Sequence, residues 1–416
     1  MKLLLKSVTI IDESSSHNNK KLDIFIDHGV IKKIGKNLSE KADKEIKVKN
    51  LHVSRGWFDS SVNFGEPGYE DRETIANGLD TAGKSGFSSV ALNPYTYPVL
   101  DHSGIIASVK AKAASHPVEL YPVGALTIKS EGVDLAELLD MKMAGAVSFG
   151  DYKRPQRNPN LLKIALQYAQ NFDALIQSFP QENRISGPGI VNEHVNSTSL
   201  GLKGIPNLAE ELQVTRDLYL LEYTGGKLHI PTISTEKSVK LIKEAKKKGL
   251  DVSCSVAVHN LILNDDELKE FDTRSKVLPP LRTKNDSKAL IKGLKDGTID
   301  MITSDHNPID VEHKKVEFDN ALYGSIGLES AFGALCKIFD TNETIEYLTR
   351  GKKRFGIDEY EIKEGDPADL SLFIPGDSFT FTTEDILSTS KNSIFLNKEL
   401  KGKGFGVITQ KGFISN

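Results

Sequence analysis

Short apolar runs alternate with amphipathic segments through the middle of the chain. The runs have the length and composition of buried parallel strands, and the segments between them carry apolar side chains at helical spacing. In Glu236–Lys248, for example, apolar residues fall on one face and lysines on the other. Asn207–Tyr223 and Asp286–Leu294 show the same pattern. The apolar runs are Val53–Phe64, Ser88–Asn93, Val118–Leu126, Ala144–Phe149, Ala174–Phe179, Lys227–Ile233, Val252–Val258 and Met301–Ser304.

Eight such strand and helix units over about 300 residues predict an α/β fold of the TIM (β/α)8 barrel kind. A doubly wound parallel sheet is the competing arrangement, but it requires a glycine-rich phosphate-binding turn after the first strand. The first run instead continues into Phe64-Gly65-Glu66-Pro67-Gly68, which is no such turn. The barrel is therefore favoured, and any chemistry is expected at the carboxyl ends of its strands.

Both ends of the chain have a different pattern. Residues 1–52 and residues 356–416 contain short β-like runs separated by turns, and the polar stretch 14–19 is expected to form a hairpin tip. We expect the two termini to fold together into one small β-rich domain, with residues 53–355 forming the barrel between them.

Composition narrows the functional classes. Lys and Arg number 53 against 57 Asp and Glu, a net charge of −4, which argues against nucleic acid as the main partner. The only two cysteines, Cys254 and Cys336, cannot form a disulfide framework. No stretch approaches the roughly 20 apolar residues of a membrane span, and the amino terminus lacks a signal-peptide pattern. A cytoplasmic protein is expected, with no membrane partner.

Several ordered motifs resemble class I dihydroorotases of the cyclic amidohydrolase family. They are Trp57–Gly68, Ser85–Val90, Ala144–Phe149, Leu200–Pro206, Thr224–Ile230, Pro279–Arg282, Asp296–Asp300, Ser304–Pro308, Gly324–Glu329 and Gly365–Leu370. The resemblance covers nearly the whole chain. It implies an amidohydrolase-type barrel and a role in pyrimidine biosynthesis, where family enzymes interconvert carbamoyl aspartate and dihydroorotate with a metal-bound hydroxide.

The resemblance also implies where metal ligands would stand. Family enzymes usually hold zinc with a His-x-His pair after the first strand, a carboxylate after the fourth, histidines after the fifth and sixth, and an aspartate after the eighth. The corresponding residues here are Ser61, Asn63, Tyr152, Phe179, Thr232 and Asp305. Only Asp305 keeps the family identity. Because zinc needs three or four nitrogen, sulfur or carboxylate ligands, we expect no zinc or other metal cofactor in this chain.

The positions that anchor substrate in the family have changed as well. A carboxylate-binding arginine corresponds to Gly65, and two asparagines correspond to Tyr95 and Leu278. The expected vestigial pocket therefore consists of Ser61, Asn63, Gly65, Tyr95, Tyr152, Phe179, Thr232, Leu278 and Asp305, with no confident catalytic residue. The aromatic replacements are expected to fill space once occupied by metal and water.

Other reactive residues have structural interpretations. Asp305 and His306 are expected to be satisfied by neighbours, and His259 to lie at a loop or helix start. Strand alternation from Thr232 predicts that His229 packs against the helices rather than facing the mouth. A new metal site from Asp305, His259 and Asp151 would need a geometry that the sequence does not specify. Asp59 and Glu66 are expected to hold strand and loop geometry, Ser61 lacks a nucleophile elbow, and Cys254 is expected to be a buried, inert thiol.

Three functions remain open. The first is an inactive, dihydroorotase-like structural or regulatory partner, for which the resemblance makes aspartate transcarbamoylase the best candidate partner. The second is an active cyclic amidohydrolase with an altered, metal-independent site. The third is a self-assembling scaffold, as in cytoskeletal relatives of dihydropyrimidinase. A homo-oligomer is compatible with each.

Overall fold

Eight parallel strands form the wall of a barrel in the structure, a computed structural model that describes residues 1–416. Neighbouring strands in the wall follow one another along the chain, from first to last. They are β6 (Trp57–Val62), β7 (Phe87–Leu92), β8 (Glu119–Gly124), β9 (Ser148–Phe149), β10 (Leu175–Gln177), β13 (Lys227–Ile230), β14 (Val252–Ala257) and β15 (Met301–Thr303). Each falls within or overlaps one of the predicted apolar runs, so the predicted barrel is confirmed.

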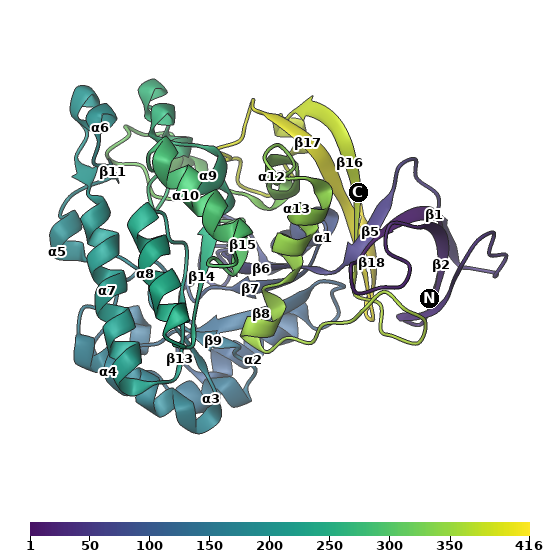
Figure 1. Cartoon of the computed structure of the whole chain (residues 1–416), viewed down its shortest axis with the longest axis horizontal. Helices are drawn as coiled ribbons and strands as arrows, with labels where there is room; N and C mark the ends of the chain where they lie inside the picture. The colour runs from purple at the N-terminus through teal and green to yellow at the C-terminus, as the bar shows by residue number, and fades with distance from the viewer.

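Helices cover the outside of the barrel (Figure 1). The three predicted amphipathic helices are present as α7, α8 and α10. In α8 the buried residues are on one face, and the Thr235 hydroxyl caps the first turn by accepting the Ser238 N–H. The helices of eight or more residues are α1 (Ile75–Lys84), α2 (Ser103–Ala113), α4 (Pro159–Ala169), α7 (Asn207–Thr224), α8 (Glu236–Lys247), α10 (Lys284–Lys295), α12 (Leu328–Leu335) and α13 (Thr341–Thr349). Shorter ones are α3 (Leu138–Met143), α5 (Asn183–Ser186), α6 (Val195–Leu200), α9 (Val258–Ile262) and α11 (Val311–Lys314).

The two termini form a second sheet beside the barrel, as predicted (Figure 1). Its order is β18-β17-β16-β5-β1-β2-β3, with β4 paired to β1. The strands are β1 (Lys2–Ile11), β2 (Lys21–Asp27), β3 (Val30–Gly35), β4 (Lys44–Ile46), β5 (His52–Arg55), β16 (Leu370–Thr380), β17 (Glu399–Thr409) and β18 (Gly412–Ser415). A short pair, β11 (Val191–Asn192) and β12 (Gly204–Ile205), lies in a long excursion between β10 and α7.

The chain passes from this sheet to the barrel at Gly56, inside the run that the sequence presented as one strand. β5 pairs with β1 and β16, whereas β6 begins the barrel. A Cβ at Gly56 would lie 2.0 Å from the Asp369 Oδ1 and 2.1 Å from the Ser88 Oγ. Only glycine lets the backbone turn this closely against both units, and a hydrophobicity pattern carries no sign of that contact.

The C-terminal segment is not confined to the small sheet. Residues 381–398 leave it between β16 and β17 and pack over the barrel. The Asn392 side chain donates to the backbone carbonyls of Asn307 and Gly324 at 3.2 and 3.1 Å, and the Ser390 hydroxyl donates to that of Arg72 at 2.8 Å. The C-terminus therefore helps to fix loops that surround the carboxyl ends of the barrel strands.

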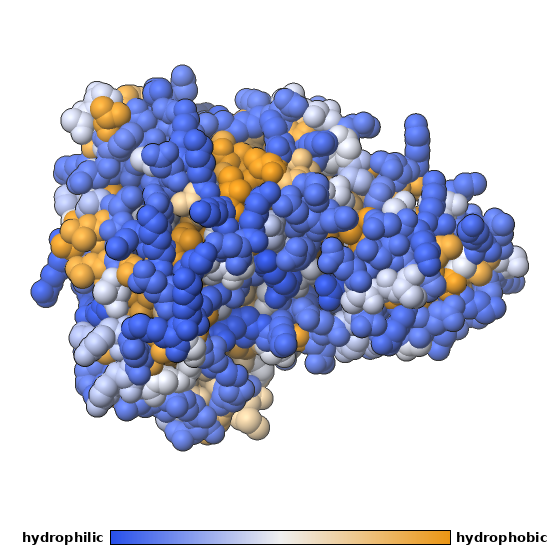
Figure 2. Space-filling view, viewed as in Figure 1, coloured by the Kyte–Doolittle hydropathy of each residue, from blue (hydrophilic) through white to orange (hydrophobic).

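Packing separates a barrel interior from a small-sheet core. A cluster inside the barrel takes one residue from each of five wall strands, together with Phe355 and Ile357 from the segment after α13. A separate cluster of 16 buried residues lies in the small sheet. The outer surface is mainly polar, with an apolar patch over α5 and the start of α7 formed by the exposed side chains of Ile185, Leu208 and Leu212 (Figure 2). No helix is both long and apolar enough to span a bilayer.

Asp59 closes the barrel between its first and last strands. Its buried carboxylate accepts the Ser304 backbone N–H at 2.9 Å and the Thr303 hydroxyl, both from the last strand and the residue after it. It also accepts the Ser61 N–H at 3.1 Å within its own strand. Two residues after Ser61, the Asn63 N–H donates to the His306 carbonyl at 2.8 Å. The two strand ends are thereby held in register by side chain and backbone together.

We expect Asp59→Ala to lower the free energy of unfolding by about 3 kcal/mol, because it leaves buried donors on both strands without an acceptor. Urea unfolding followed by circular dichroism measures the change. Asp377→Ala, at an exposed position in β16, serves as the control and should shift stability by less than about 0.5 kcal/mol. Equal effects in the two variants would contradict the closing role of Asp59.

Candidate functional site

The carboxyl ends of the barrel strands meet around a very small cavity. Its volume is about 10 Å³, whereas pockets for small molecules typically measure about 300–1,000 Å³. Four positions singled out from the sequence line it: Ser61, Tyr152, Phe179 and Thr232. The structure therefore brings together, from four different strands, positions far apart in the chain.

Asn63 and Asp305 lie beside the same cluster. The Tyr152 hydroxyl is buried close to both, and burial together with the negative charge of Asp305 holds its pKa well above the ordinary value. Several buried polar atoms here have no hydrogen-bond partner. They are the Oδ1 and Nδ2 of Asn63, the Tyr152 hydroxyl, the Asp305 Oδ1 and the His259 Nε2.

The other three predicted positions lie around this cluster. Leu278 packs with Phe179, Ile205 and Ala209 in a buried apolar group. The Tyr95 ring lies 5.6 Å from that of Tyr152, measured between centroids. Gly65 has a φ of +79°, and a Cβ there would lie 2.3 Å from the Tyr69 carbonyl oxygen, so this loop has no room for a side chain. Aromatic and aliphatic side chains therefore stand beside polar ones at this mouth.

Lys153 places a positive charge inside this mouth. Its Nζ lies 2.8 Å from the Asp305 Oδ2, with the lysine and aspartate side chains 10% and 2% exposed. The same ammonium lies 5.0 Å from the centre of the Tyr152 ring. Burial raises the pKa of Asp305, and the charge of Lys153 and its hydrogen bond oppose that rise. The one carboxylate retained from the family motif is therefore neutralised by the protein's own cation.

Sequence reasoning missed Lys153. The resemblance places the family carboxylate at Tyr152, where it is absent, and gives the residue after it no role. A lysine directly after a missing carboxylate, in a loop at the strand ends opposite the remaining aspartate, was the available signal. Its φ of +52° is a backbone conformation that non-glycine residues seldom adopt, and the sequence did not reveal it.

The residues at this mouth do not fit a zinc ion. No group of three or more His, Cys, Asp or Glu side chains in the structure is arranged to hold a metal, and zinc needs at least three such ligands. Asp151 is already used, because its carboxylate accepts the Leu126 and Thr127 N–H groups at 2.9 and 3.0 Å and the Thr127 hydroxyl at 2.6 Å. The Lys153 ammonium would also repel a divalent cation beside Asp305.

The His229 side chain faces the interior of the barrel, so the prediction that it packs against the outer helices is wrong. Its Nδ1 lies 2.8 Å from the Ser253 Oγ, and its ring is 5.7 Å from that of Phe355 in the interior cluster. The prediction assumes that side chains between His229 and Thr232 alternate between the two faces of a regular strand. The φ of +51° at Thr232 breaks that regular geometry. Burial lowers the pKa of His229 to about 3, which keeps it neutral.

The remaining candidates are held by structural contacts. The His306 Nε2 lies 2.8 Å from the Glu73 Oε2, with both side chains fully buried, and its Nδ1 accepts the Gly327 N–H at 3.2 Å. Glu66 accepts the Ile75 N–H at 2.7 Å at the start of α1. The Ser61 Oγ accepts the Asn93 side-chain N–H at 3.0 Å.

His259 and Cys254 are both buried. His259 lies in α9, where burial lowers its pKa to about 3. Burial raises the pKa of the Cys254 thiol, so the thiolate needed for nucleophilic chemistry is disfavoured. Neither residue forms an activated pair with a base or an acid.

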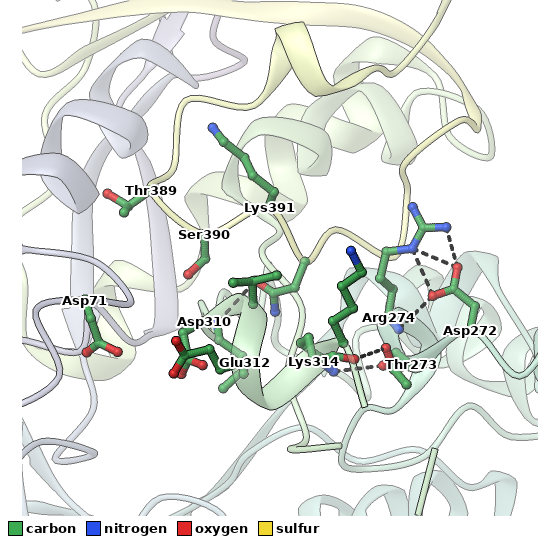
Figure 3. A pocket seen from close by; sticks show the side chains of 14 residues that line it. Asp71, Asp272, Thr273, Arg274, Asp310, Glu312, Lys314, Thr389, Ser390 and Lys391 are labelled. Carbon is green, nitrogen blue, oxygen red and sulfur yellow. Dashed lines mark hydrogen bonds and ion pairs between the residues drawn. The ribbon is translucent and has the colours of Figure 1, made fainter. Parts of the chain in front are cut away.

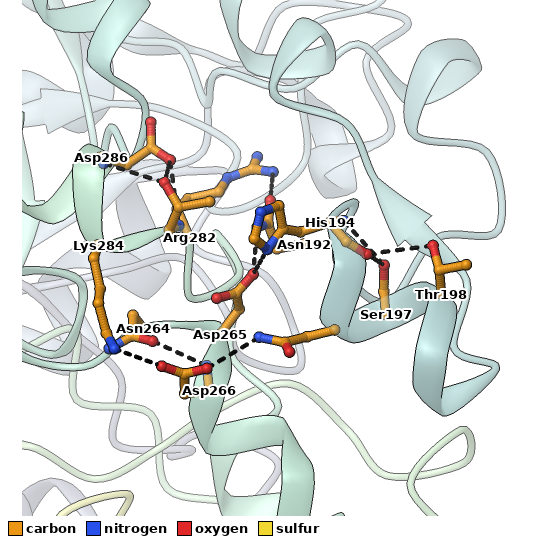
Figure 4. Close-up of polar contacts among 12 residues, drawn as sticks. Asn192, His194, Ser197, Thr198, Asn264, Asp265, Asp266, Arg282, Lys284 and Asp286 are labelled. Carbon is orange, nitrogen blue, oxygen red and sulfur yellow. Dashed lines mark hydrogen bonds and ion pairs between the residues drawn. The ribbon is translucent and has the colours of Figure 1, made fainter.

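Arg282 shows what one retained family motif does here. Its buried guanidinium donates to the Asn192 side-chain oxygen at 3.0 Å (Figure 4). It also donates to the Ile205 carbonyl at 2.7 Å and to the Ser234 hydroxyl at 3.1 Å. The three acceptors come from β11, β12 and the loop after β13. The arginine therefore ties the excursion between β10 and α7 to the barrel, which is a scaffold function.

A hollow of about 690 Å³ shares no lining residue with the cavity at the strand ends, and Figure 3 shows the side chains that line it. It is bounded by segments around Asp272, Asp310 and Lys391. Two of its charged side chains are held by neighbours, since the Arg274 Nε lies 2.7 Å from the Asp272 Oδ2 and the Lys314 Nζ donates to the Thr273 carbonyl at 2.8 Å. Burial and the nearby Lys276 charge lower the pKa of Lys314 to about 7. We find no converging set of reactive groups in this hollow.

Solved structures share this arrangement of barrel and small sheet. The fold is similar to that of an L-hydantoinase (dihydropyrimidinase) from Arthrobacter aurescens, with a TM-score of 0.84, 20% identity and coverage of 100% of this chain and 96% of the other. A dihydropyrimidinase from Brevibacillus agri matches with a TM-score of 0.82, 20% identity and coverage of 100% and 95%.

Relatives found by sequence show the family to which the chain belongs. Residues 52–238 match the family model described as "Dihydro-orotase-like". A protein named dihydroorotase from Geotalea daltonii is 38% identical over 97% of this chain and 96% of its own length. One from Pelotomaculum thermopropionicum is 38% identical over 98% and 97%. The chain belongs to the dihydroorotase family.

We expect Lys153→Met to lower the free energy of unfolding by about 3 kcal/mol, because it leaves the buried Asp305 carboxylate without a counter-charge. The double variant Lys153→Met with Asp305→Asn should recover most of that loss. Chemical denaturation of the single and double variants measures the coupling. Lys240→Met, at a 62% exposed lysine in α8, is the control. Additive losses in the double variant would contradict a direct ion pair.

Proposed function

We propose that this chain is a non-catalytic member of the dihydroorotase family that serves pyrimidine biosynthesis in the cytoplasm as a structural or regulatory partner. The observation that carries the proposal is the composition of the barrel mouth. One family carboxylate remains there, and it is paired with Lys153 at 2.8 Å. Ser, Asn, Tyr, Phe and Thr occupy the other ligand positions. This set of groups supplies neither a metal-bound hydroxide nor a replacement nucleophile and base.

Packing supports the same proposal. The cavity at the mouth measures about 10 Å³, close to the space of a single water molecule. Phe179 and Leu278 stand in one buried apolar group where the family resemblance places a metal ligand and a substrate contact. Meanwhile contacts that hold the barrel, such as those of Asp59 and Arg282, are complete. Loss of chemistry with retention of the scaffold is the pattern expected of a structural partner.

An active cyclic amidohydrolase with an altered site is the second candidate. The observations that favour it are the likeness to relatives named dihydroorotase along nearly the whole chain and the unpartnered buried groups of Asn63, Tyr152 and Asp305. Such groups could bind an uncharged amide. The arrangement lacks an activated water or nucleophile, and so we favour the non-catalytic function.

Metal content and activity separate these two functions. We expect the protein purified with added zinc to hold far less than one zinc per chain and to show no ring opening of dihydroorotate. Asp305→Ala should change neither result. The combined variant Ser61→His, Asn63→His, Phe179→His and Thr232→His should gain zinc, because it restores four imidazole positions. Elemental analysis and a dihydroorotate assay measure these outcomes. Stoichiometric zinc or ring opening with the unaltered protein would contradict the proposal.

The partner we propose is aspartate transcarbamoylase encoded by the same genome. Mixed at micromolar concentrations, the two proteins should co-elute in size-exclusion chromatography at a mass greater than either alone. The exposed patch of Ile185, Leu208 and Leu212 supports assembly in general, because apolar patches often mark protein contacts. Separate elution of the two proteins, verified by analytical ultracentrifugation, would contradict this partner. Self-association of the chain alone would instead support a homo-oligomeric scaffold.

A further inference from the structure

A second, larger hollow lies beside the filled mouth, between loops that follow the first four barrel strands. Its volume is about 480 Å³, within the usual size range of small-molecule sites. A mainly polar hollow of about 360 Å³ adjoins it and shares Ser130, Glu131, Asp151 and Arg154 with it. Together they form one depression with an aromatic part and a charged part.

Tyrosines form the wall of the aromatic part. The Tyr69 and Tyr95 rings are stacked with centroids 6.3 Å apart and an interplanar angle of 28°, and Tyr95 is followed by Tyr152 at 5.6 Å. Tyr97, also in the wall, is 71% exposed. The Arg72 guanidinium already lies 4.4 Å from the Tyr69 ring centre, and Lys153 lies over Tyr152. With cations at both ends of the row, the wall suits a planar ring that is not itself positively charged.

Cations without carboxylate partners characterise the charged part. Lys129, Arg154 and Arg157 line the depression. None is among the 31 residue pairs that form ion pairs in the structure. The Arg154 side chain is oriented by a backbone carbonyl of a neighbouring loop, because its Nη1 donates to the Ser130 carbonyl at 3.2 Å. Three carboxylates, Asp101, Glu131 and Asp151, line the same two hollows. Two of them are held by backbone N–H groups, because Asp101 accepts the Lys129 N–H and Asp151 accepts the Leu126 and Thr127 N–H groups. The three cations have no ion-pair partner, and an arginine held by a carbonyl, such as Arg154, suits a phosphate group.

The loops that carry these cations have an unusual backbone. Lys129 and Ser130 each have a φ of +55°, and Lys153 has a φ of +52°. Two consecutive non-glycine residues in the left-handed region are costly, and such conformations concentrate at binding sites. Here they project Lys129 and the Ser130 carbonyl toward the depression, where the carbonyl orients Arg154.

We propose that this depression binds a nucleoside monophosphate. The base lies against Tyr95 and Tyr97, and the phosphate lies among Lys129, Arg154 and Arg157. The planar base meets the requirement of the tyrosine wall, and the phosphate supplies the negative charge that the unpaired cations lack. This inference goes beyond the proposed function, because binding here requires neither activity nor its absence.

Isothermal titration of the full-length protein with AMP and with UMP tests the proposal. At least one of them should bind saturably with one site per chain, and uridine or adenosine alone and inorganic phosphate alone should each bind at least about tenfold more weakly. Raising the salt concentration should weaken nucleotide binding, because exposed cations hold the phosphate. The measurement involves no turnover, so its outcome is independent of whether the chain has hydrolase activity.

Matched variants locate the site. Tyr97→Ala and Arg157→Gln should each raise the dissociation constant at least about fivefold. Tyr219→Ala, at a tyrosine that is 73% exposed on α7, and Lys240→Gln on α8 should leave it unchanged. Circular dichroism checks that each variant is folded.

Three results would overturn the proposal. They are the absence of saturable binding of either nucleotide up to about 1 mM, equal weakening by the site and control variants, and binding of dihydroorotate or carbamoyl aspartate in place of the nucleotides.

Discussion

The hydrogen bonds of Asp59 join the first and last strands of the barrel, and the rest of the molecule depends on that closure. A barrel wall has no free edge only when its ends meet. Here one buried carboxylate accepts the Thr303 hydroxyl and the Ser304 N–H across the join. Closure fixes where the strand ends lie, and therefore where Asn63 and Asp305 stand on neighbouring strand ends at the mouth.

Charge balance at that mouth explains how the fold can persist without a metal. A carboxylate as buried as Asp305 requires a positive neighbour, since an uncompensated buried charge is costly. Lys153 provides it at 2.8 Å. Apolar and aromatic groups such as Phe179 and Tyr152 stand around the pair, and the buried contact of His306 with Glu73 is present at 2.8 Å. The buried charge of Asp305 is therefore balanced by a side chain of the protein itself.

The C-terminal segment and the loops after the barrel strands surround this mouth. Residues 381–398 leave the small sheet and fix loops on the barrel, while loops after the first four strands form the tyrosine-lined depression. The closed mouth lies beneath a larger, partly charged depression. This face therefore offers room for a ligand beside the filled mouth.

The sequence by itself determined the barrel, the co-folded termini and the list of strand-end positions, because apolar periodicity and motif order reflect burial along the chain. The tertiary structure decided the features that depend on backbone conformation or on contacts between distant segments. Gly56 divides an apparently single strand because Asp369 and Ser88 approach it. The left-handed Thr232 shifts the alternation, so His229 lies inside the wall. Lys153 reaches Asp305, 152 positions away. Local patterns cannot encode such pairings, since each arises only when the strand ends are brought together in space.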